Sequence, residues 1–320
     1  MAEYRYRLTE TDHYTIGQSD CSAVYMMMLS DRGNTIEAVV SPEMGMSMLD
    51  FSAGGVPLLQ KSRKHDFIEG RKGLGPLILP HFNQRASFPA VNEMVAEQAP
   101  HTAYLKTEGV NDPFQHGIGR YAQWNFETSC TDKGARVTGK LTGAHEYQGV
   151  PLMELTGFDF TAFVTYTLSD GNISVRFDIT GAEPVTAGIH FYYRLPDQEE
   201  SRAALSVEEI GKNNDESLFE FSSHQRDGRF YTMTLADDID TLFTPVKEEG
   251  PYARYKLITS EYRLDTRVRA EGDPAKTFDS VTLFHPADAD FVCIEPLSDA
   301  NPLTPRKKKF SGEIILHPIV

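Results

Sequence analysis

Residues 158–180 read F-D-F-T-A-F-V-T-Y-T-L-S-D-G-N-I-S-V-R-F-D-I-T, and their alternation decides the fold class. From Phe158 to Leu168, apolar residues occupy every second position, and only Phe163 interrupts the polar series between them. Residues 173–179 alternate in the same way. The dipeptide Asp170-Gly171 lies between the two runs and suits a tight turn. Two period-two runs around such a turn predict a β-hairpin with one buried face.

The same pattern extends outward from this hairpin in both directions. Asp31, Gly33 and Asn34 have turn chemistry between two early strand patterns. Strands are predicted at residues 23–29, 35–40, 186–193, 229–235, 252–258, 262–268, 281–284, 291–295 and 313–316. The only helix candidate is a short one at residues 89–98. So many alternating strands need a second sheet to cover their apolar face, which predicts an all-β antiparallel sandwich of two sheets formed by one domain over residues 1–320.

Composition limits the classes of function. The 320 residues carry a formal net charge of −15, which repels phosphate backbones and argues against a nucleic-acid partner. The longest early apolar run, residues 23–29, is far too short for a membrane span, and the N-terminus lacks the apolar core of a signal peptide. Cys21, Cys130 and Cys293 are too few and too scattered for a disulfide framework. We therefore expect a cytoplasmic protein that binds neither nucleic acid nor membrane.

Common catalytic motifs are absent from the sequence. No histidine pair or cysteine pair has the spacing of a metal site, so no metal is expected. The segments G-I-G-R at Gly117 and G-L-G-P at Gly73 lack the full glycine pattern of a phosphate-binding loop. No G-x-S-x-G elbow is present, which leaves a serine hydrolase without its nucleophile motif.

Two residues remain as candidates for acid and base chemistry. His190 lies in G-I-H-F-Y-Y at the end of the strand-rich middle, and Glu295 directly follows the apolar run F-V-C-I. From the residues alone, His190 is more simply explained as a hydrogen-bonded core histidine. Glu295 can be a strand-end surface residue or a functional carboxylate, because an ionised carboxylate near a core is costly without a partner.

Five segments in order give the chain a resemblance to a known family. They read G-P-L-I-L-P-H-F-N-Q-R, Q-H-G-I-G-R-Y-A-Q-W, A-G-I-H-F-Y-Y-R-L-P, D-D-I-D-T-L-F and F-V-C-I-E-P-L-S-D-A-N-P. With this order and spacing, the chain resembles the aldose 1-epimerase (galactose mutarotase) family over most of its length. The resemblance implies a large antiparallel β supersandwich that interconverts the anomers of a free aldose without a cofactor.

The resemblance also implies roles for individual residues. Glu295 would be the general base and His190 the general acid, with His116 as a second active-site histidine. Arg85, Asp240 and Asn83 would hold sugar hydroxyls. The aromatic residues Phe191, Tyr192, Tyr193 and Trp124 can stack on a sugar ring or belong to the core.

The sequence departs from the family pattern and leaves alternatives open. His190-Phe191-Tyr192-Tyr193 stands where the family has H-P-Y-F, and Gln84 separates Asn83 from Arg85. Asp237 or Asp238 can take the place of Asp240. The substrate can be a hexose 6-phosphate if cations line the pocket, for which Arg85, Arg120 and Arg194 are the candidates. A non-catalytic carbohydrate-binding protein is the alternative to an enzyme, and the working unit is a monomer or a homodimer.

Overall fold

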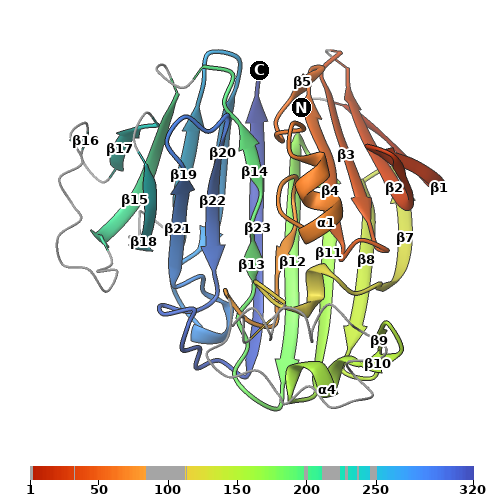
Figure 1. Cartoon of the computed structure of the whole chain (residues 1–320). Helices are drawn as coiled ribbons and strands as arrows, with labels where there is room; N and C mark the ends of the chain where they lie inside the picture. Colours follow the sequence, from red (N-terminus) through yellow and green to blue (C-terminus); the bar gives the residue numbers. More distant parts are fainter. Residues whose placement is uncertain are drawn as a thin grey trace.

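A computed structural model describes residues 3–31, 33–83, 112, 114–197, 201–210, 224–227, 230–235, 238–245 and 251–320. Within these ranges the chain is built almost entirely from antiparallel strands, which confirms the predicted all-β class (Figure 1). Two helices are present there, α1 (Lys64–Gly70) and α4 (Leu152–Thr156), with 3₁₀ turns at Ile118–Arg120 and Pro274–Lys276. The candidate helix at residues 89–98 lies outside the described ranges.

The strands form two main sheets. The smaller sheet contains, in order, β1 (Tyr4–Ile16), β2 (Ser19–Ser30), β3 (Thr35–Ser41), β4 (Ser47–Ala53) and β5 (Val56–Pro57). The larger sheet follows the order β6 (Leu77–Ile78), β13 (Gly188–Ile189), β22 (Phe291–Leu297), β21 (Ser280–His285), β18 (Ile239–Pro245), β15 (Arg202–Ile210), β19 (Tyr252–Ile258), β20 (Arg263–Arg269), β23 (Lys309–Ile319), β12 (Asn172–Gly181), β11 (Phe160–Ser169), β8 (Gly134–Thr142) and β7 (Asn125–Thr131). Off this path, β14 (Tyr192–Arg194) pairs with β22, β17 (Phe230–Thr234) pairs with β15, and β16 (His224–Asp227) pairs with β17. The short strands β9 (Glu146–Tyr147) and β10 (Val150–Pro151) form a separate pair.

The hairpin predicted at residues 158–180 is present as β11 and β12, which lie between β23 and β8 near the β7 edge of the larger sheet. Ser169 pairs with Asn172, and Asp170 and Gly171 have φ values of 49° and 77° in the turn between them. Two successive positive φ values are typical of the tight hairpin turn whose twist matches the strands. Phe163, which breaks the alternation, lies on the outer face, with the Lys140 ammonium 5.7 Å from its ring centroid.

The buried face of this hairpin packs against the smaller sheet. Apolar side chains of β2, β3 and β4 share one continuous core with those of β8, β11, β12 and β23. The Tyr166 hydroxyl donates a hydrogen bond of 2.8 Å to the Met46 carbonyl and so joins β11 to the turn before β4. The predicted sandwich of two sheets is therefore present, and burial of this core is its main stabilising contribution.

One predicted strand differs from the structure. Residues 186–193 do not form a single strand, because pairing is interrupted at His190 and Phe191 between β13 and β14. The interruption is local, because the neighbours stay the same on both sides: the His190 and Tyr192 amides donate to the carbonyls of Pro76 and Leu74, and both β13 and β14 pair with β22. The interruption places His190 at a break in the sheet edge.

No helix in the described ranges is long and apolar enough to cross a membrane.

Candidate active site

A cavity of about 400 Å³ gathers most of the residues that the sequence singled out. Its wall includes Asn83, His116, His190, Asp240 and Glu295, which come from five separate parts of the chain. Arg85, predicted to bind a sugar hydroxyl, lies outside the described ranges. Volumes of about 300–1,000 Å³ are typical of small-molecule sites, so the cavity has room for a monosaccharide.

Glu295 and His190 face each other across a short distance. Oε1 of Glu295 lies 3.2 Å from Nε2 of His190, and both side chains are buried. The sequence pattern placed Glu295 at the end of a strand. In the structure it lies within β22, opposite Thr282 of β21. Oε2 of Glu295 and Nδ1 of His190 have no hydrogen-bond partner among the described residues. The pair therefore retains unused hydrogen-bonding capacity in a buried position, which is unusual for a purely structural contact.

His116 is held beside this pair by a reciprocal contact with Asn83. The His116 amide donates to the Asn83 carbonyl at 3.0 Å, and the Asn83 amide donates to Nδ1 of His116 at 3.2 Å. Because Nδ1 accepts a hydrogen bond, the proton of the neutral ring is on Nε2. The rings of His116 and His190 meet edge to face, with centroids 4.9 Å apart. Asn83 and His116 thus position each other, which gives Asn83 a structural role in addition to any contact with a ligand.

The aromatic residues near His190 divide between the cavity and the core. Tyr192 lines the cavity and stacks on His190, with centroids 4.9 Å apart and an interplanar angle of 26°. Phe191, Tyr193 and Trp124 belong instead to the buried core between the sheets. Of the four aromatic residues considered from the sequence, Tyr192 alone lines this cavity.

Arg120 is a buried charged group that lies close enough to affect the pKa values of Glu295 and His190. It lines the cavity although its side chain is 1% exposed. Its Nε donates to the Leu77 carbonyl at 3.0 Å, and Nη2 has no hydrogen-bond partner among the described residues. Arg194, the other arginine considered for a phosphate, does not line this cavity and pairs with Glu261.

Burial shifts the proton affinities of these groups in opposite directions. Burial raises the pKa of Glu295 well above its usual value, and the nearby Arg120 guanidinium partly opposes this rise. Burial, followed by the positive charge of Arg120, lowers the pKa of His190 well below its usual value. The pKa of His116 is lowered for the same reasons. Shifts in these directions favour the uncharged carboxylic acid of Glu295 and the uncharged imidazoles of His190 and His116.

Asp240 approaches the cavity from β18, where it is paired with Phe284 of β21. Burial, and then the charge of Asp238, raises its pKa. Asp238, an alternative to Asp240 from the sequence, is exposed and does not line the cavity, whereas Asp237 lies outside the described ranges. Among the described aspartates of this motif, Asp240 is therefore the one at the cavity.

Comparison with known proteins identifies the architecture. The sequence matches no protein-family model and no curated protein. Among solved structures, the chain is similar to a galactose mutarotase-like protein from Clostridium acetobutylicum, with 12% identity, a TM-score of 0.66, and coverage of 98% of this chain and 99% of that one. It is also similar to a galactose 1-epimerase from Lactobacillus acidophilus, with 13% identity, a TM-score of 0.65 and coverage of 98% of both chains. This chain has the galactose mutarotase fold. The resemblance noticed in the sequence is thereby confirmed at the level of the fold.

Within this mutarotase fold, several cavity residues were not selected from the sequence. They include Lys72, Gln115 and Thr282. Lys72 belongs to the glycine- and proline-rich segment that follows α1, which has the composition of a loop that offers polar groups. Gln115 directly precedes His116. The composition of this loop could have indicated Lys72 as a candidate site residue. Thr282 lies in an ordinary strand pattern, and only its pairing with Glu295 shows that it is near the site.

The site also contains a set of possible metal ligands that local spacing did not indicate. One ligand atom each from His190, Cys293 and Glu295 lies within 4.8 Å of the others, and all three residues are buried. These residues are brought together by the pairing of β14 and β22. Nitrogen, sulfur and carboxylate donors are those that Zn²⁺ accepts. Two of these three residues, His190 and Glu295, are also the residues that the sequence predicts for acid and base chemistry.

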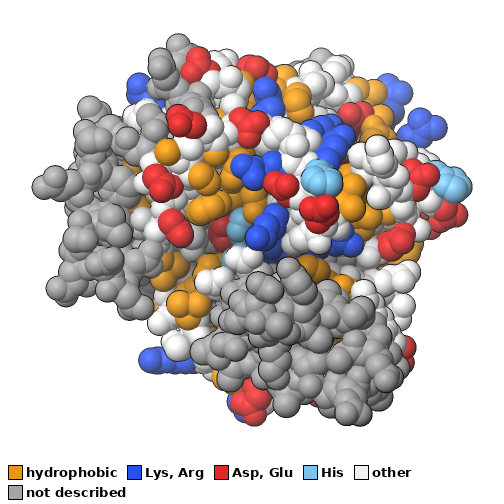
Figure 2. All heavy atoms as spheres, viewed as in Figure 1, with side chains coloured by type: hydrophobic (Ala, Val, Ile, Leu, Met, Phe, Trp, Pro, Cys, Tyr) orange, Lys and Arg blue, Asp and Glu red, His pale blue; other side chains and the backbone are white. Residues whose placement is uncertain are grey.

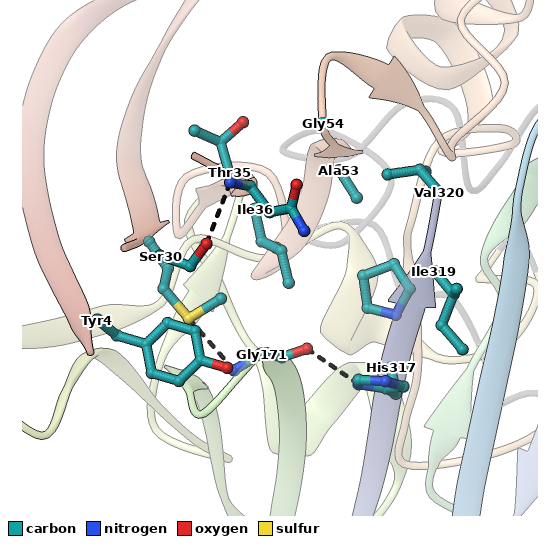
Figure 3. Close-up of a pocket in the computed structure, with 13 residues that line it drawn as sticks. Tyr4, Ser30, Thr35, Ile36, Ala53, Gly54, Gly171, His317, Ile319 and Val320 are labelled. Atoms are coloured by element: carbon teal, nitrogen blue, oxygen red, sulfur yellow. Dashed lines mark hydrogen bonds between the residues drawn. The ribbon is translucent and has the colours of Figure 1, made fainter. Parts of the chain in front are cut away.

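A second cavity, of about 260 Å³, shares no lining residue with the first (Figure 3). It lies where Tyr4, Ser30, Asn34, Gly54, Gly171 and the end of β23 come together. Nδ1 of His317 contacts the Gly171 carbonyl, as the dashed line in the figure marks. No carboxylate side chain of the described residues lines this cavity. It therefore lacks the acid and base pair that distinguishes the first cavity.

Proposed function

We propose that the chain is an aldose 1-epimerase that interconverts the α and β anomers of a free monosaccharide. The observation that carries this proposal is the 3.2 Å contact between buried Glu295 and His190 on the wall of a cavity of monosaccharide size. The mutarotase fold supports it, and so does the similarity to a protein described as a galactose 1-epimerase.

The reaction needs one proton to leave the sugar and one to reach it. The Glu295 carboxylate removes the proton from the hydroxyl group on C1. As the C1–O5 bond breaks, the His190 imidazolium donates its Nε2 proton to O5, and C1 becomes an aldehyde. Rotation about C1–C2 presents the other face of the aldehyde, and the same groups return their protons in reverse. A positioned acid or base typically contributes about 10²–10⁴-fold to such a step.

The directions of the pKa shifts suit this cycle. With the cyclic sugar bound, the reactive pair is Glu295 carboxylate and His190 imidazolium; after ring opening it is Glu295 carboxylic acid and neutral imidazole. The pair holds one proton in both states. Burial raises the pKa of Glu295 and lowers that of His190, which favours the neutral state formed on ring opening. Arg120 opposes the first shift, because its positive charge stabilises the carboxylate. Arg120 at the same time reinforces the second shift, because its charge disfavours the imidazolium, so burial lowers the free energy of the neutral state relative to the charged one.

The remaining cavity residues have supporting roles in this proposal. His116 donates its Nε2 proton to a sugar oxygen, since its Nδ1 is already engaged by the Asn83 amide. Asp240 accepts hydrogen bonds from sugar hydroxyls, and Tyr192 covers a face of the ring. Arg85 stays a predicted ligand of a hydroxyl. The proposed steps balance with these side chains alone.

The cellular setting of the protein is likewise proposed. We infer a cytoplasmic, monosaccharide-binding protein that acts as a monomer or homodimer and binds neither nucleic acid nor membrane. The net charge of −15 supports the part of this proposal that concerns nucleic acid.

A sugar panel tests the proposed activity. Freshly dissolved α-D-glucose, α-D-galactose and methyl α-D-glucoside are each followed by polarimetry with and without the protein. We expect faster equilibration of at least one free sugar and no change in the glycoside, because a glycoside has no C1 hydroxyl proton to remove. Binding of the free sugars without any acceleration would instead identify a non-catalytic carbohydrate-binding protein. Cleavage of the glycoside would identify a glycosidase.

A further inference from the structure

Cys293 brings a sulfur atom close to the carboxylate and the imidazole of the candidate site. The ligand atoms of His190, Cys293 and Glu295 lie within 4.8 Å of one another, and all three residues are buried. Oε2 of Glu295 and Nδ1 of His190 have no hydrogen-bond partner among the described residues. Buried polar atoms without a partner are expected where a water or an ion completes the bonding.

The larger sheet fixes these three residues relative to one another. Cys293 and Glu295 are two positions apart in β22, so their side chains leave the strand on the same face. His190 lies at the break between β13 and β14, and both of these strands pair with β22. Ligands held on paired strands are positioned more precisely than ligands on loops, which suits an ion with a strict geometry.

The spacing of the donor atoms suits a tetrahedral zinc ion. Nitrogen and oxygen ligands about 2.0–2.1 Å from such an ion lie roughly 3.3 Å apart. Nε2 of His190 and Oε1 of Glu295 are 3.2 Å apart. A sulfur ligand about 2.3 Å from the ion lies roughly 3.6 Å from the other ligands, so Sγ of Cys293 has to move inward by at most about 1.2 Å. Rotation about the Cα–Cβ bond of Cys293 can provide such a movement.

The charges of the three donors balance those of a divalent ion. A thiolate from Cys293 and a carboxylate from Glu295 together carry two negative charges, and the imidazole binds as a neutral group. The complex with Zn²⁺ is then electrically neutral, which reduces the cost of burying the charges. Arg120 lines the same cavity, and its positive charge opposes the binding of a cation. Both anionic ligands are therefore needed, so the affinity is expected to depend strongly on Cys293.

We propose that His190, Cys293 and Glu295 form a binding site for Zn²⁺ whose fourth coordination position opens into the cavity, and that the bound ion inhibits the protein. The inhibitory part rests on the proposed epimerase function. Zn²⁺ takes the Glu295 oxygen and the His190 nitrogen that the reaction uses, so the sugar can neither lose its C1 proton nor receive one at O5. The thiol proton of Cys293 is released to solvent on binding.

A cation can approach the protein without crossing a continuous positive surface on the face shown in Figure 2. There the lysine and arginine side chains of the described residues are interspersed with carboxylates (Figure 2). The chain as a whole has a net charge of −15, so its overall field attracts a divalent cation. His190 and Glu295 line the cavity, which gives the ion a route to them.

The test uses Co²⁺ as a coloured substitute for Zn²⁺. Metal-free wild type, Cys293→Ala, Cys293→Ser and the double variant Cys21→Ala/Cys130→Ala are titrated with Co²⁺, and the bound Co²⁺ is then displaced with Zn²⁺. The double variant is the control, because it keeps Cys293 as the only cysteine of the chain. Polarimetry follows the equilibration of a free sugar by each protein with Zn²⁺, with Mg²⁺ and after addition of a chelator.

We expect the wild type and the double variant to bind Co²⁺ with the near-ultraviolet charge-transfer band of a thiolate ligand. Both Cys293 variants lose this band and bind Zn²⁺ at least about 100-fold more weakly, because the loss of even an outer-shell partner of a ligand costs about 10–100-fold. Zn²⁺ stops equilibration by the wild type, and the chelator restores it. Mg²⁺ has no such effect, since it prefers oxygen ligands.

Three results overturn the proposal. They are a wild type without the charge-transfer band, a band that is lost in the double variant or kept in both Cys293 variants, and bound Zn²⁺ that leaves equilibration by the wild type unchanged. The wild type and the double variant decide the first two points even if a Cys293 variant does not fold. If no sugar equilibrates faster with the protein, the proposed epimerase function fails, and the Co²⁺ spectra and Zn²⁺ affinities decide the metal site by themselves.

Discussion

Glu295 is a carboxylate inside a strand whose seven residues are all buried. Placing an ionisable group there costs free energy, because the charged form loses its hydration. His190 and Arg120 partly offset this cost, but Oε2 still lacks a hydrogen-bond partner among the described residues. Buried titratable groups with unused bonding capacity beside a cavity are more common at functional sites than elsewhere. The energetic cost of Glu295 is therefore accounted for by the proposed role as general base.

The pH dependence of the proposed reaction follows from the one proton that Glu295 and His190 share in the proposed mechanism. At acid pH a second proton adds to the pair at His190 and stops the reaction. Because the pKa of His190 is lowered, this loss of activity occurs only below the usual histidine pKa of 6.5. At alkaline pH the pair loses its single proton, which leaves Glu295 charged and His190 neutral. Because the pKa of Glu295 is raised, this loss of activity occurs only above the usual glutamate pKa of 4.5. We expect a bell-shaped profile of kcat/KM against pH, with its acid limb below 6.5 and its alkaline limb displaced to higher pH. An acid limb above pH 7 would contradict this assignment.

At this scale the sequence predicted some residues well and others not at all. Glu295, His190, His116, Asn83 and Asp240 were selected through ordered motifs, and all five line one cavity. Arg120 was selected for a phosphate, but the two backbone carbonyls that its side chain reaches, Leu77 and Arg71, are distant in sequence. Contacts of this kind depend on tertiary structure, so no local pattern indicates that its charge faces Glu295.

At the scale of elements, the backbone around Gly117 holds His116 in place. Gly117 has φ 93°, and a Cβ atom there would lie 1.9 Å from the Leu79 carbonyl oxygen. The Leu79 amide in turn donates to the His116 carbonyl at 3.1 Å. A glycine is therefore required for the two segments to approach closely enough to place His116 beside His190.

Gly117→Ala is expected to lower the free energy of unfolding by about 3 kcal/mol or more and to slow catalysis, because the segments must separate. Gly55→Ala is the matched control: Gly55 has φ 80° but no atom within 4 Å of a Cβ. It should cost only about 1–2 kcal/mol, the cost of the left-handed backbone. Urea denaturation measures both variants. Equal losses would show that the approach to Leu79 does not constrain the loop.

The elements also show where pattern reading succeeds. The β11–β12 hairpin was predictable because its alternation and its turn residues are adjacent in sequence. The break between β13 and β14 was not predictable from local patterns. The His190 amide there donates to the Pro76 carbonyl, which lies 114 positions earlier in the chain. The short helices α1 and α4, of seven and five residues, are too brief to produce a helical periodicity.

At the scale of the molecule, alternation predicted two sheets but not their membership. β1 to β5 pair in sequence order, but no local signal shows that their sheet ends at β5. That β22 lies far from β23 in the larger sheet follows from long-range pairing that no local signal encodes. One domain over residues 1–320 stays a prediction, and the core that the two sheets share is the reason for proposing it.

If the chain is one domain, it should unfold in one cooperative step. Thermal unfolding followed by near-UV and far-UV circular dichroism should give coincident transitions, and the calorimetric and van't Hoff enthalpies should agree. Two transitions that separate with denaturant would instead indicate that the sheets are independent units.

The central claim is that Glu295 and His190 open the sugar ring together, and the rate of anomer exchange in Glu295→Gln tests it most directly. The amide keeps the shape of the side chain but cannot accept the C1 proton. Polarimetry of a freshly dissolved α-sugar that the wild type equilibrates should show a catalysed rate about 10²–10⁴-fold lower in Glu295→Gln, with unchanged circular dichroism. A Glu295→Gln protein that equilibrates the sugar at the wild-type rate would contradict the account.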